Sequence, residues 1–401
     1  MNTLFKGARL TKAMRNIMAL RLLFVMANIL GPFAALFLNR HYLLDNSEVA
    51  LALTLMSAFY LTGNLLGGAL TGRYTLRLLL LGASACSSVF VLSAIVLSTS
   101  ATSIAMVLMF VLCAGVTTPV FSMLTSLAAN DDNRIASFGY LHLASNLGAA
   151  LLFVIGGYLI DLQSHYLMAF AASASIACFL ASASLALPER RICTSQNSTK
   201  ISRNVIEIPR AVIVAGILFF ALSVLDAQRE YQLPLWLDAI AVDYAANIFA
   251  AVGIVNASLV ILITQPLIAL TSRYSTLANM ALAGIFYGIG FGAYAFFEHT
   301  AWILSFVVFW TMGEILGITY ITALIAQKAS LRTQPGLFSL IPILLALARM
   351  VSVGIGVSLI SSVGFMLSWS LYGLLGLLLG GVYWLRDEKP SASQISSPRR
   401  S

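Results

Sequence analysis

The amino-acid sequence predicts an all-α transmembrane protein with twelve helices in two six-helix bundles. Of its 401 residues, 60% are hydrophobic and 9% are charged, whereas a soluble domain carries about 25% charged residues. The apolar runs are about 20 to 25 residues long, which is enough to cross a hydrocarbon core about 30 Å thick. Alternating strand patterns about ten residues long are absent, which excludes a transmembrane β-barrel.

Twelve apolar segments are separated by polar connections. We expect helices at residues 18–39, 47–70, 76–97, 103–128, 136–160, 165–187, 210–235, 243–270, 276–297, 301–326, 336–362 and 365–385. Lys6, Arg9, Lys12 and Arg15 precede the first segment, as in a signal peptide. That segment is long and no small-residue cleavage site follows it, so we interpret it as an uncleaved first helix.

One long polar stretch, residues 188–209, divides six predicted helices from six. We therefore expect an N-terminal bundle over residues 1–187, a cytosolic linker over 188–209 and a C-terminal bundle over 210–385. The tail, residues 386–401, is polar and rich in Ser and Pro, a composition typical of disorder.

The basic residues predict the orientation, because cytoplasmic loops of membrane proteins collect Lys and Arg. With both termini in the cytosol, 19 of the 23 Lys and Arg residues lie on the cytosolic side and only Arg40 lies on the other. The net charge of +8 therefore reflects topology, and we expect no nucleic-acid partner. The spacing of the four cysteines matches no metal motif, so we expect free thiols, no metal and no cofactor.

An internal repeat supports the division into halves. Ala69–Tyr74 (ALTGRY) recurs 200 residues later as Ala269–Tyr274 (ALTSRY). Both copies follow the second predicted helix of their half and precede the third, which favours duplication over chance. Duplicated halves are typical of secondary transporters, which bind their substrate between the halves near the membrane midplane.

The first copy of the repeat belongs to a longer motif. Gly68–Arg77 (GALTGRYTLR) resembles the major facilitator superfamily signature between helices two and three, Gly-x-Leu-x-Asp-Arg-x-Gly-Arg-Lys/Arg. The chain departs from the signature at Gly72 and Thr75, which replace the Asp and the second Gly. The resemblance implies a twelve-helix transporter, and the missing Asp weakens a cytosolic latch of the family. The gating residues that it implies, together with their counterpart in the repeat, are Gly68, Arg73, Arg77 and Arg273.

Two further segments are similar to bacterial multidrug efflux members, which are drug:proton antiporters. Glu230–Leu235 (EYQLPL) resembles their acidic-x-x-Leu-Pro pattern, and Glu314 lies where some of them carry a membrane-embedded Glu. In the fifth predicted helix, Gly148 and Gly156-Gly157 fit the outer glycines of the antiporter signature, but its central Gly-Pro is missing. The resemblance implies a multi-pass protein of the bacterial cytoplasmic membrane, a monomer that takes small molecules and protons as partners.

The charges inside the predicted helices indicate the same region. A charge at the centre of a membrane helix costs about 2.5–3.5 kcal/mol on insertion scales, so it needs a partner, a wet cavity or a function. Apart from Glu48, in the first turn of the predicted helix 47–70, the carboxylates within predicted spans lie in the second half, as do Arg229 and Arg349. Asp226, Arg229 and Glu230 are spaced to share one helix face. The residues that we expect to couple protons are Glu314, Asp226, Glu230 and Arg349.

Glu314 and Arg349 lie at similar depth in the tenth and eleventh predicted helices, which predicts an ion pair. One interpretation is purely structural. The other is that protonation of Glu314 releases Arg349 and favours one facing state of a transporter. The second interpretation predicts that Glu314→Gln abolishes proton coupling.

Polar and aromatic residues of the spans are candidates to face a substrate cavity, although Asn and Thr also serve helix packing. The candidates for substrate binding are Arg229, Gln232, Asn28, Tyr60, Thr118, Asn146, Trp310 and Tyr320.

These features favour proton-coupled export of small amphipathic or cationic compounds. A transporter of a small metabolite, anion or siderophore bound by Arg229 or Arg349 stays open, as does a membrane sensor that kept the fold without turnover. We do not expect an enzyme, because the sequence has no metal-binding cluster, nucleotide-binding glycine loop or nucleophile–base set.

Overall fold

The computed structural model describes residues 11–97, 99–128, 134–188, 209–241, 244–328 and 334–386. All regular secondary structure within these ranges is helical, so the predicted all-α class is confirmed. The predicted tail and nearly all of the predicted linker lie outside the described residues.

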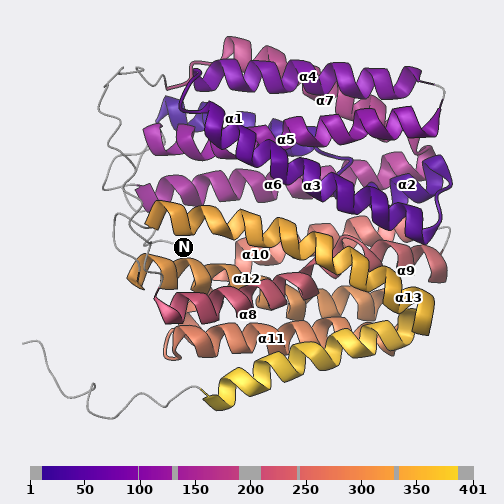
Figure 1. The fold of residues 1–401 in the computed structure, drawn as a ribbon, viewed down its shortest axis with the longest axis vertical. Helices are drawn as coiled ribbons and strands as arrows, with labels where there is room; N and C mark the ends of the chain where they lie inside the picture. The colour runs from indigo at the N-terminus through magenta and orange to yellow at the C-terminus, as the bar shows by residue number, and fades with distance from the viewer. Residues whose placement is uncertain are drawn as a thin grey trace, which may run out of the picture.

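The two halves contain elements in the same order (Figure 1). The first half contains α1 Lys12–Ala27, α2 Ala34–Tyr42, α3 Asn46–Leu70, α4 Leu76–Val96, α5 Ser100–Ala128, α6 Arg134–Leu162 and α7 His165–Ser184. The second half contains α8 Arg210–Asp226, η2 Ala227–Arg229, α9 Gln232–Ile240, α10 Ala245–Thr271, α11 Thr276–Gly292, η3 Ala293–Ala295, α12 Thr300–Lys328 and α13 Gln334–Arg386.

Within the described ranges, ten helical stretches are long and apolar enough to cross a membrane. One of them, Ile341–Gly381, has 41 residues and contains two spans joined at Gly364, whose φ of 75° is not helical. Helices α1 and α2, with 16 and 9 residues, are too short to be counted singly but follow each other directly. This arrangement is consistent with the twelve predicted spans.

The structure corrects the sequence prediction at two helices, because the first span of each half is interrupted. The predicted helix 18–39 is broken between Ala27 and Ala34. The predicted helix 210–235 is broken between Asp226 and Gln232 and then continues to Ile240. Sliding-window hydropathy does not detect these breaks, because each is short and is averaged with the apolar residues on both sides of it.

The repeated motif has the same local structure in both halves. Thr75 caps the first turn of α4 by accepting a hydrogen bond from the backbone N–H of Leu78. Ser275 caps α11 in the same way through the N–H of Ala278. A hydroxyl at the N-cap satisfies a backbone donor that the helix leaves free. The predicted position of the repeat, between the second and third spans of each half, is thus confirmed.

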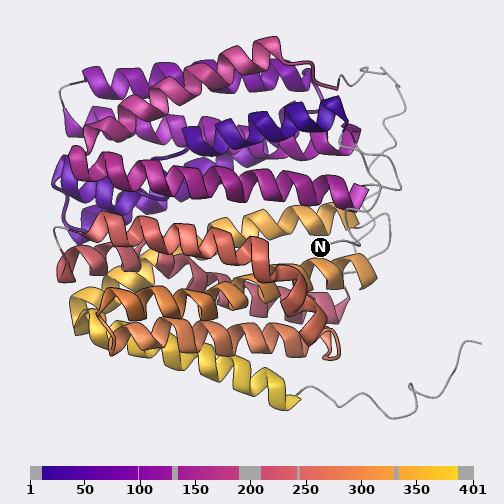
Figure 2. The same ribbon diagram turned by 180° about the vertical axis from the view of Figure 1, so that it is seen from behind.

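The halves form two stacked bundles, the first indigo to magenta and the second salmon to yellow (Figure 1). They meet along two seams: α3 lies against the first arm of α13, and α6 lies against α10 on the opposite face (Figure 2). Phe33 joins the seam between α6 and α10, with ring centroids 5.7 Å from Phe153 and 5.5 Å from Phe249. The substrate-sized space described below lies between the bundles.

Candidate functional site

The two interrupted spans define the centre of the molecule. In the first half, Gly31-Pro32 lies in the break; Pro32 has no backbone N–H and disfavours helix at the residue before it. In the second half, Pro234 lies in the first turn of α9, where a missing N–H is tolerated. Interrupted helices at corresponding positions of duplicated halves mark the binding site in many transporter folds.

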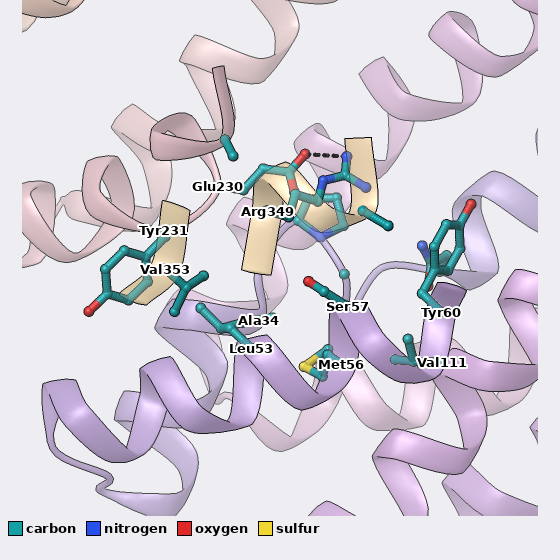
Figure 3. Close-up of a pocket in the computed structure, with 15 residues that line it drawn as sticks. Ala34, Leu53, Met56, Ser57, Tyr60, Val111, Glu230, Tyr231, Arg349 and Val353 are labelled. Carbon is teal, nitrogen blue, oxygen red and sulfur yellow. Dashed lines mark hydrogen bonds and ion pairs between the residues drawn. The ribbon is translucent and has the colours of Figure 1, made fainter. Parts of the chain in front are cut away.

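A cavity of about 220 Å³ lies between the two breaks. Its lining includes Asn28, Gly31 and Pro32 from the first break and Ala227, Glu230 and Tyr231 from the second. The remaining lining residues are Ala34, Leu53, Met56, Ser57, Tyr60, Val111, Ala346, Arg349 and Val353 (Figure 3). The wall is therefore mostly apolar, with a few polar groups from both halves, as is usual for small-molecule sites.

Glu230 and Arg349 form an ion pair on the cavity wall (Figure 3). Arg349 Nη2 lies 2.8 Å from Glu230 Oε1. Each side chain keeps 37% of its surface exposed although both come from apolar membrane helices. Since a charged group is not stable against lipid, this exposed surface faces the cavity.

A second group of charges lies behind the first, around Arg229. Its guanidinium lies 2.8 Å from Glu314 Oε2 and 3.3 Å from Asp226 Oδ2. Asn256 donates a hydrogen bond of 2.9 Å to Glu314, and Tyr287 donates one of 3.1 Å to Asp226. Arg229 thus bridges two carboxylates, each of which accepts a further hydrogen bond.

The Trp310 indole packs against one face of the Arg229 guanidinium. The guanidinium carbon lies 5.7 Å from the centre of the indole ring, within the range of a cation–π contact. The ring is 1% exposed, and its Nε1 donates a hydrogen bond of 2.9 Å to Tyr294. The indole therefore holds the arginine in place and excludes water from that side.

The two groups together carry unequal charge. Among the described residues, this connected set contains three carboxylates, Asp226, Glu230 and Glu314, and two guanidinium groups, Arg229 and Arg349. One carboxylate is therefore in excess when all five groups are ionised. A proton or a cationic ligand is needed to neutralise the set in a region of low dielectric.

The predicted ion pair between Glu314 and Arg349 is wrong. Arg229 pairs with Glu314, and Arg349 pairs with Glu230. The cause is the break after α8, where Ala227–Arg229 form a turn of 3₁₀-helix. A 3₁₀ turn advances about 120° per residue instead of about 100°, and Glu230 and Tyr231 lie between that turn and α9, so the α-helical register behind the prediction is lost after Asp226. Arg229 therefore faces α12, whereas Glu230 faces α13.

The other residues predicted to bind substrate fall into two groups. Asn28 and Tyr60 line the cavity, and the Tyr60 hydroxyl lies 2.9 Å from Thr118 Oγ1, which places Thr118 directly behind the wall. The remaining three do not line the cavity. Their hydrogen-bond partners show where they lie: Gln232 accepts from Ser368, Asn146 donates to the carbonyl of His142, and the Tyr320 hydroxyl contacts that of Thr271.

The predicted gating residues lie at the ends of helices that bear the repeat. Arg77 donates to the carbonyls of Ser182 and Ala183 at the end of α7. Arg273 packs over the Tyr274 ring, 4.9 Å from its centre. Gly68 and Arg73 are exposed. Arg77 thus has a structural task, satisfying carbonyls that a helix end leaves free, beside the gating role that the sequence suggested.

The structure adds a contact region between the halves that the sequence did not reveal. Arg40 lies 2.5 Å from Asp238 and 3.5 Å from Asp161. Asn247 also donates to Asp161. By the predicted orientation these residues lie at the extracytosolic end, and we call them the outer latch. They join α2 and α6 of the first half to α9 and α10 of the second.

Asn256 and Tyr287 were also missed. Each lies within an apolar helix, α10 and α11, and hydrogen-bonds a carboxylate of the Arg229 group. A polar residue within an apolar span can be recognised from the sequence, and Asn256 is such a residue. Its partner could not be predicted, because the distance between α10 and α12 depends on how the bundle packs.

The fold and this site define a class of membrane carriers: two duplicated helical bundles around a central cavity that contains a few polar and charged groups. A family model described as Major Facilitator Superfamily matches residues 18–341. The chain therefore belongs to the Major Facilitator Superfamily. Members of this family are transporters and not enzymes, so the chain is a multi-pass membrane transporter for a small-molecule substrate.

Solved structures of the same family share the fold. A peptide transporter, POT, in complex with sulfate superposes with a TM-score of 0.76 at 15% identity, covering 95% of each chain. A mutant of the nucleoside transporter NupG gives 0.77 at 10% identity, covering 94% of this chain and all of that one. A POT family transporter in complex with 5-aminolevulinic acid gives 0.77 at 11% identity, covering 98% of both. No curated protein matches the chain. At these identities the likeness shows the fold alone.

Proposed function

We propose that the chain is a proton-coupled secondary transporter that exports small amphipathic compounds, cationic ones included, across the bacterial cytoplasmic membrane. The observation that carries this proposal is the excess of one carboxylate among Asp226, Arg229, Glu230, Glu314 and Arg349. The site has one negative charge to satisfy, and a proton and a cationic substrate both satisfy it. A proton on one carboxylate and a charged substrate in the cavity therefore alter the same charge balance, which is a physical basis for exchange.

The positions of the two charged groups support different roles for them, substrate binding for one and proton uptake for the other. Glu230 and Arg349 line the cavity and are available to a substrate. Asp226 and Glu314 share Arg229 behind the cavity wall. When one of these two carboxylates takes up a proton, Arg229 needs to neutralise only the other. Protonation is thereby transmitted to the break in the seventh span, which also carries Glu230.

The outer latch supports the cycle of conformations that export requires. Arg40, Asp161, Asp238 and Asn247 join the halves at the extracytosolic end, which closes that side of the cavity. A substrate then enters from the cytosol, and export follows when the latch opens. Both termini in the cytosol, a monomeric state and the bacterial cytoplasmic membrane belong to the same proposal and rest on the charge distribution and the family resemblance.

A second candidate is transport of a small metabolite or anion. The cavity of about 220 Å³ is smaller than the 300–1,000 Å³ usual for drug-sized ligands, and Arg349 offers a positive charge within it. Single substitutions separate the candidates. Glu230→Gln impairs transport of cations in the first case, whereas Arg349→Gln impairs transport of anions in the second.

Proteoliposomes test whether the protein transports at all. The purified chain is reconstituted with a pH-sensitive dye inside, a proton gradient is imposed, and cationic drugs, metabolites and siderophores are added in turn. Proton-coupled transport predicts dye responses that depend on both protein and compound. Absence of compound-dependent proton flux across the whole panel contradicts the proposal and favours a sensor that kept the fold without turnover.

A further inference from the structure

We propose that the cavity between the two helix breaks binds a small zwitterion, with the basic group of the ligand on Glu230 and its acidic group on Arg349. The proposal rests on the proposed function, because it takes this cavity as the substrate site. It goes beyond that function by fixing the substrate class: a compound that carries both charges on a small, partly apolar framework.

The first argument concerns charge. Among the described lining residues, Glu230 is the one carboxylate and Arg349 the one cation. They lie 2.8 Å apart and each exposes 37% of its side chain. Because both side chains keep part of their surface toward the cavity, a ligand can reach and separate the pair. Both charges then need new partners at the same time.

A ligand with a single charge cannot supply both partners. A monocation on Glu230 leaves Arg349 unpaired beside a bound positive charge, and a monoanion on Arg349 leaves Glu230 in the equivalent position. Leaving one member of such a pair uncompensated in a protected site is strongly unfavourable. A zwitterion replaces each partner by a ligand group of the same sign, so the site stays neutral.

The nearby charges do not alter this balance. Arg229 is engaged by Glu314 at 2.8 Å and by Asp226 at 3.3 Å. None of these three residues is among those that line the cavity. The zwitterion therefore contacts Glu230 and Arg349 directly, while the excess carboxylate remains in the Arg229 group behind the cavity wall, available to a proton.

The second argument concerns shape and hydrogen bonding. Leu53, Met56, Val111 and Val353 form an apolar wall next to the ion pair (Figure 3). Asn28 also lines the cavity, and its Oδ1 is buried without a hydrogen-bond partner. An ammonium group has donors for both Glu230 and this oxygen. The volume of about 220 Å³ limits the ligand to a size below that of most drugs.

The test compares ligands that differ only in charge. The full-length protein in lipid nanodiscs is titrated with leucine, methionine and phenylalanine, with their methyl esters, which are cations, and with their N-acetyl derivatives, which are anions. Binding is measured by calorimetry without a proton gradient. We expect at least one free amino acid to bind ten-fold or more tightly than its ester and its N-acetyl derivative. A singly charged derivative that binds as tightly as the parent overturns the proposal, as does absence of binding across the three parents.

Variants link the preference to the pair. E230Q and R349Q should each weaken binding of the zwitterion by ten-fold or more, and the double variant E230Q/R349Q should bind the three charge forms with similar affinity. The double variant removes both charges and leaves neither of them unpaired. If it folds, misfolding of a single variant can be attributed to the unpaired charge. E298Q, at an exposed position, is the matched control and should bind as the wild type does. Unchanged selectivity in the double variant overturns the assignment of the pair.

Binding and coupling are separable in this design. Zwitterion binding without any zwitterion-dependent proton flux in proteoliposomes contradicts the proposed proton coupling and leaves the substrate class standing. Proton flux driven by a singly charged compound, together with no zwitterion preference, overturns the substrate class and leaves the coupling standing.

Discussion

Arg229 is the residue on which the charged site depends, since it contacts carboxylates from two different helices. It pairs with Asp226 at the end of α8 and with Glu314 in the middle of α12. Its side chain is 20% exposed, and Trp310 covers one face of it. The carboxylates are therefore held near each other by a cation whose removal leaves two negative charges together.

We expect Arg229→Gln to destabilise the protein by about 3 kcal/mol, the lower end of the cost of breaking a buried ion pair, because both carboxylates lose their partner. Thermal denaturation of the purified variant in detergent measures the effect. The double variant R229Q/E314Q removes one of the two orphaned charges and should recover part of the loss. Equal stability of the wild type and R229Q contradicts the role of Arg229 as a bridge.

At this scale the sequence predicts which residues carry the site but not how they pair. Asp226, Glu230, Glu314, Arg229 and Arg349 are recognisable because a charge in an apolar span needs a reason. Pairing depends on direction around the helix axis, and counting residues from a helix end gives depth alone. The break after Asp226 turns Glu230 away from Arg229, which no regular periodicity describes.

Among the elements, the two broken helices decide where the cavity lies. The first break contains Gly31-Pro32, and the second runs from Ala227 to Tyr231. Both line the cavity, although 200 residues separate their positions in the chain. Broken helices expose backbone groups and small residues that a continuous helix does not offer.

We expect Pro32→Ala to lower the transport rate at least ten-fold without lowering thermal stability, because alanine is about 3 kcal/mol more favourable than proline in a helix interior and favours closure of the break. Initial rates in proteoliposomes and melting temperatures are the two measurements. Pro266→Ala is the control: Pro266 lies inside α10, is exposed and does not line the cavity. A P32A protein that transports at the wild-type rate shows that the break is not needed.

The kink of α13 depends on one glycine. Gly364 has a φ of 75° and separates the two arms of that helix. A side chain at Gly364 meets open space, so the cost of a substitution comes from the backbone alone.

We expect Gly364→Ala to destabilise the protein by about 1–3 kcal/mol, because a φ of 75° with a ψ of 177° is a backbone region that residues with a Cβ atom rarely adopt. Gly317 gives the matched control, because it also faces open space but lies inside helix α12 without a positive φ. Gly317→Ala should be neutral or stabilise by about 0.5–1 kcal/mol. Denaturation of both variants under the same conditions gives the comparison, and a G364A protein as stable as G317A contradicts the conformational argument.

Hydropathy along the sequence locates the limits of uninterrupted helices. Helices such as α3, α4 and α12 begin and end within a few residues of their predicted limits, because polar turn residues bound their apolar runs. The breaks at residues 28–33 and 227–231 were missed, since averaging over a span hides a local interruption. Gly31-Pro32 was a usable signal, whereas the second break has no such dipeptide.

At the scale of the whole molecule, the outer latch joins two bundles that the chain connects through a single linker. Arg40 of the first half contacts Asp238 of the second, and Asp161 accepts from Asn247. Phe33 packs between Phe153 and Phe249 in the same seam. These contacts join the two halves at one end of the bundle, the end that the predicted orientation places outside the cytosol.

We expect Arg40→Ala to shift the protein toward an outward-open state, because it removes the cation that joins the two halves. Spin labels are attached at two exposed positions of opposite halves, Leu43 and Tyr244. Double electron–electron resonance spectroscopy then measures the distance between the two labels. Their distance distribution should move to larger values in R40A. Glu298→Gln, at an exposed position outside the latch and the repeat, should leave it unchanged. Identical distributions in the wild type and R40A contradict the assignment of the latch.

The proton flux of Glu314→Gln tests the central claim most directly. The claim is that exchange depends on a carboxylate in excess over the arginines, and this substitution removes that excess while it keeps the shape of the side chain. In proteoliposomes with an imposed proton gradient, E314Q should bind substrate but show no substrate-dependent proton flux, whereas the exposed control E298Q should behave as the wild type. Coupled flux that persists in a correctly folded E314Q protein contradicts the account.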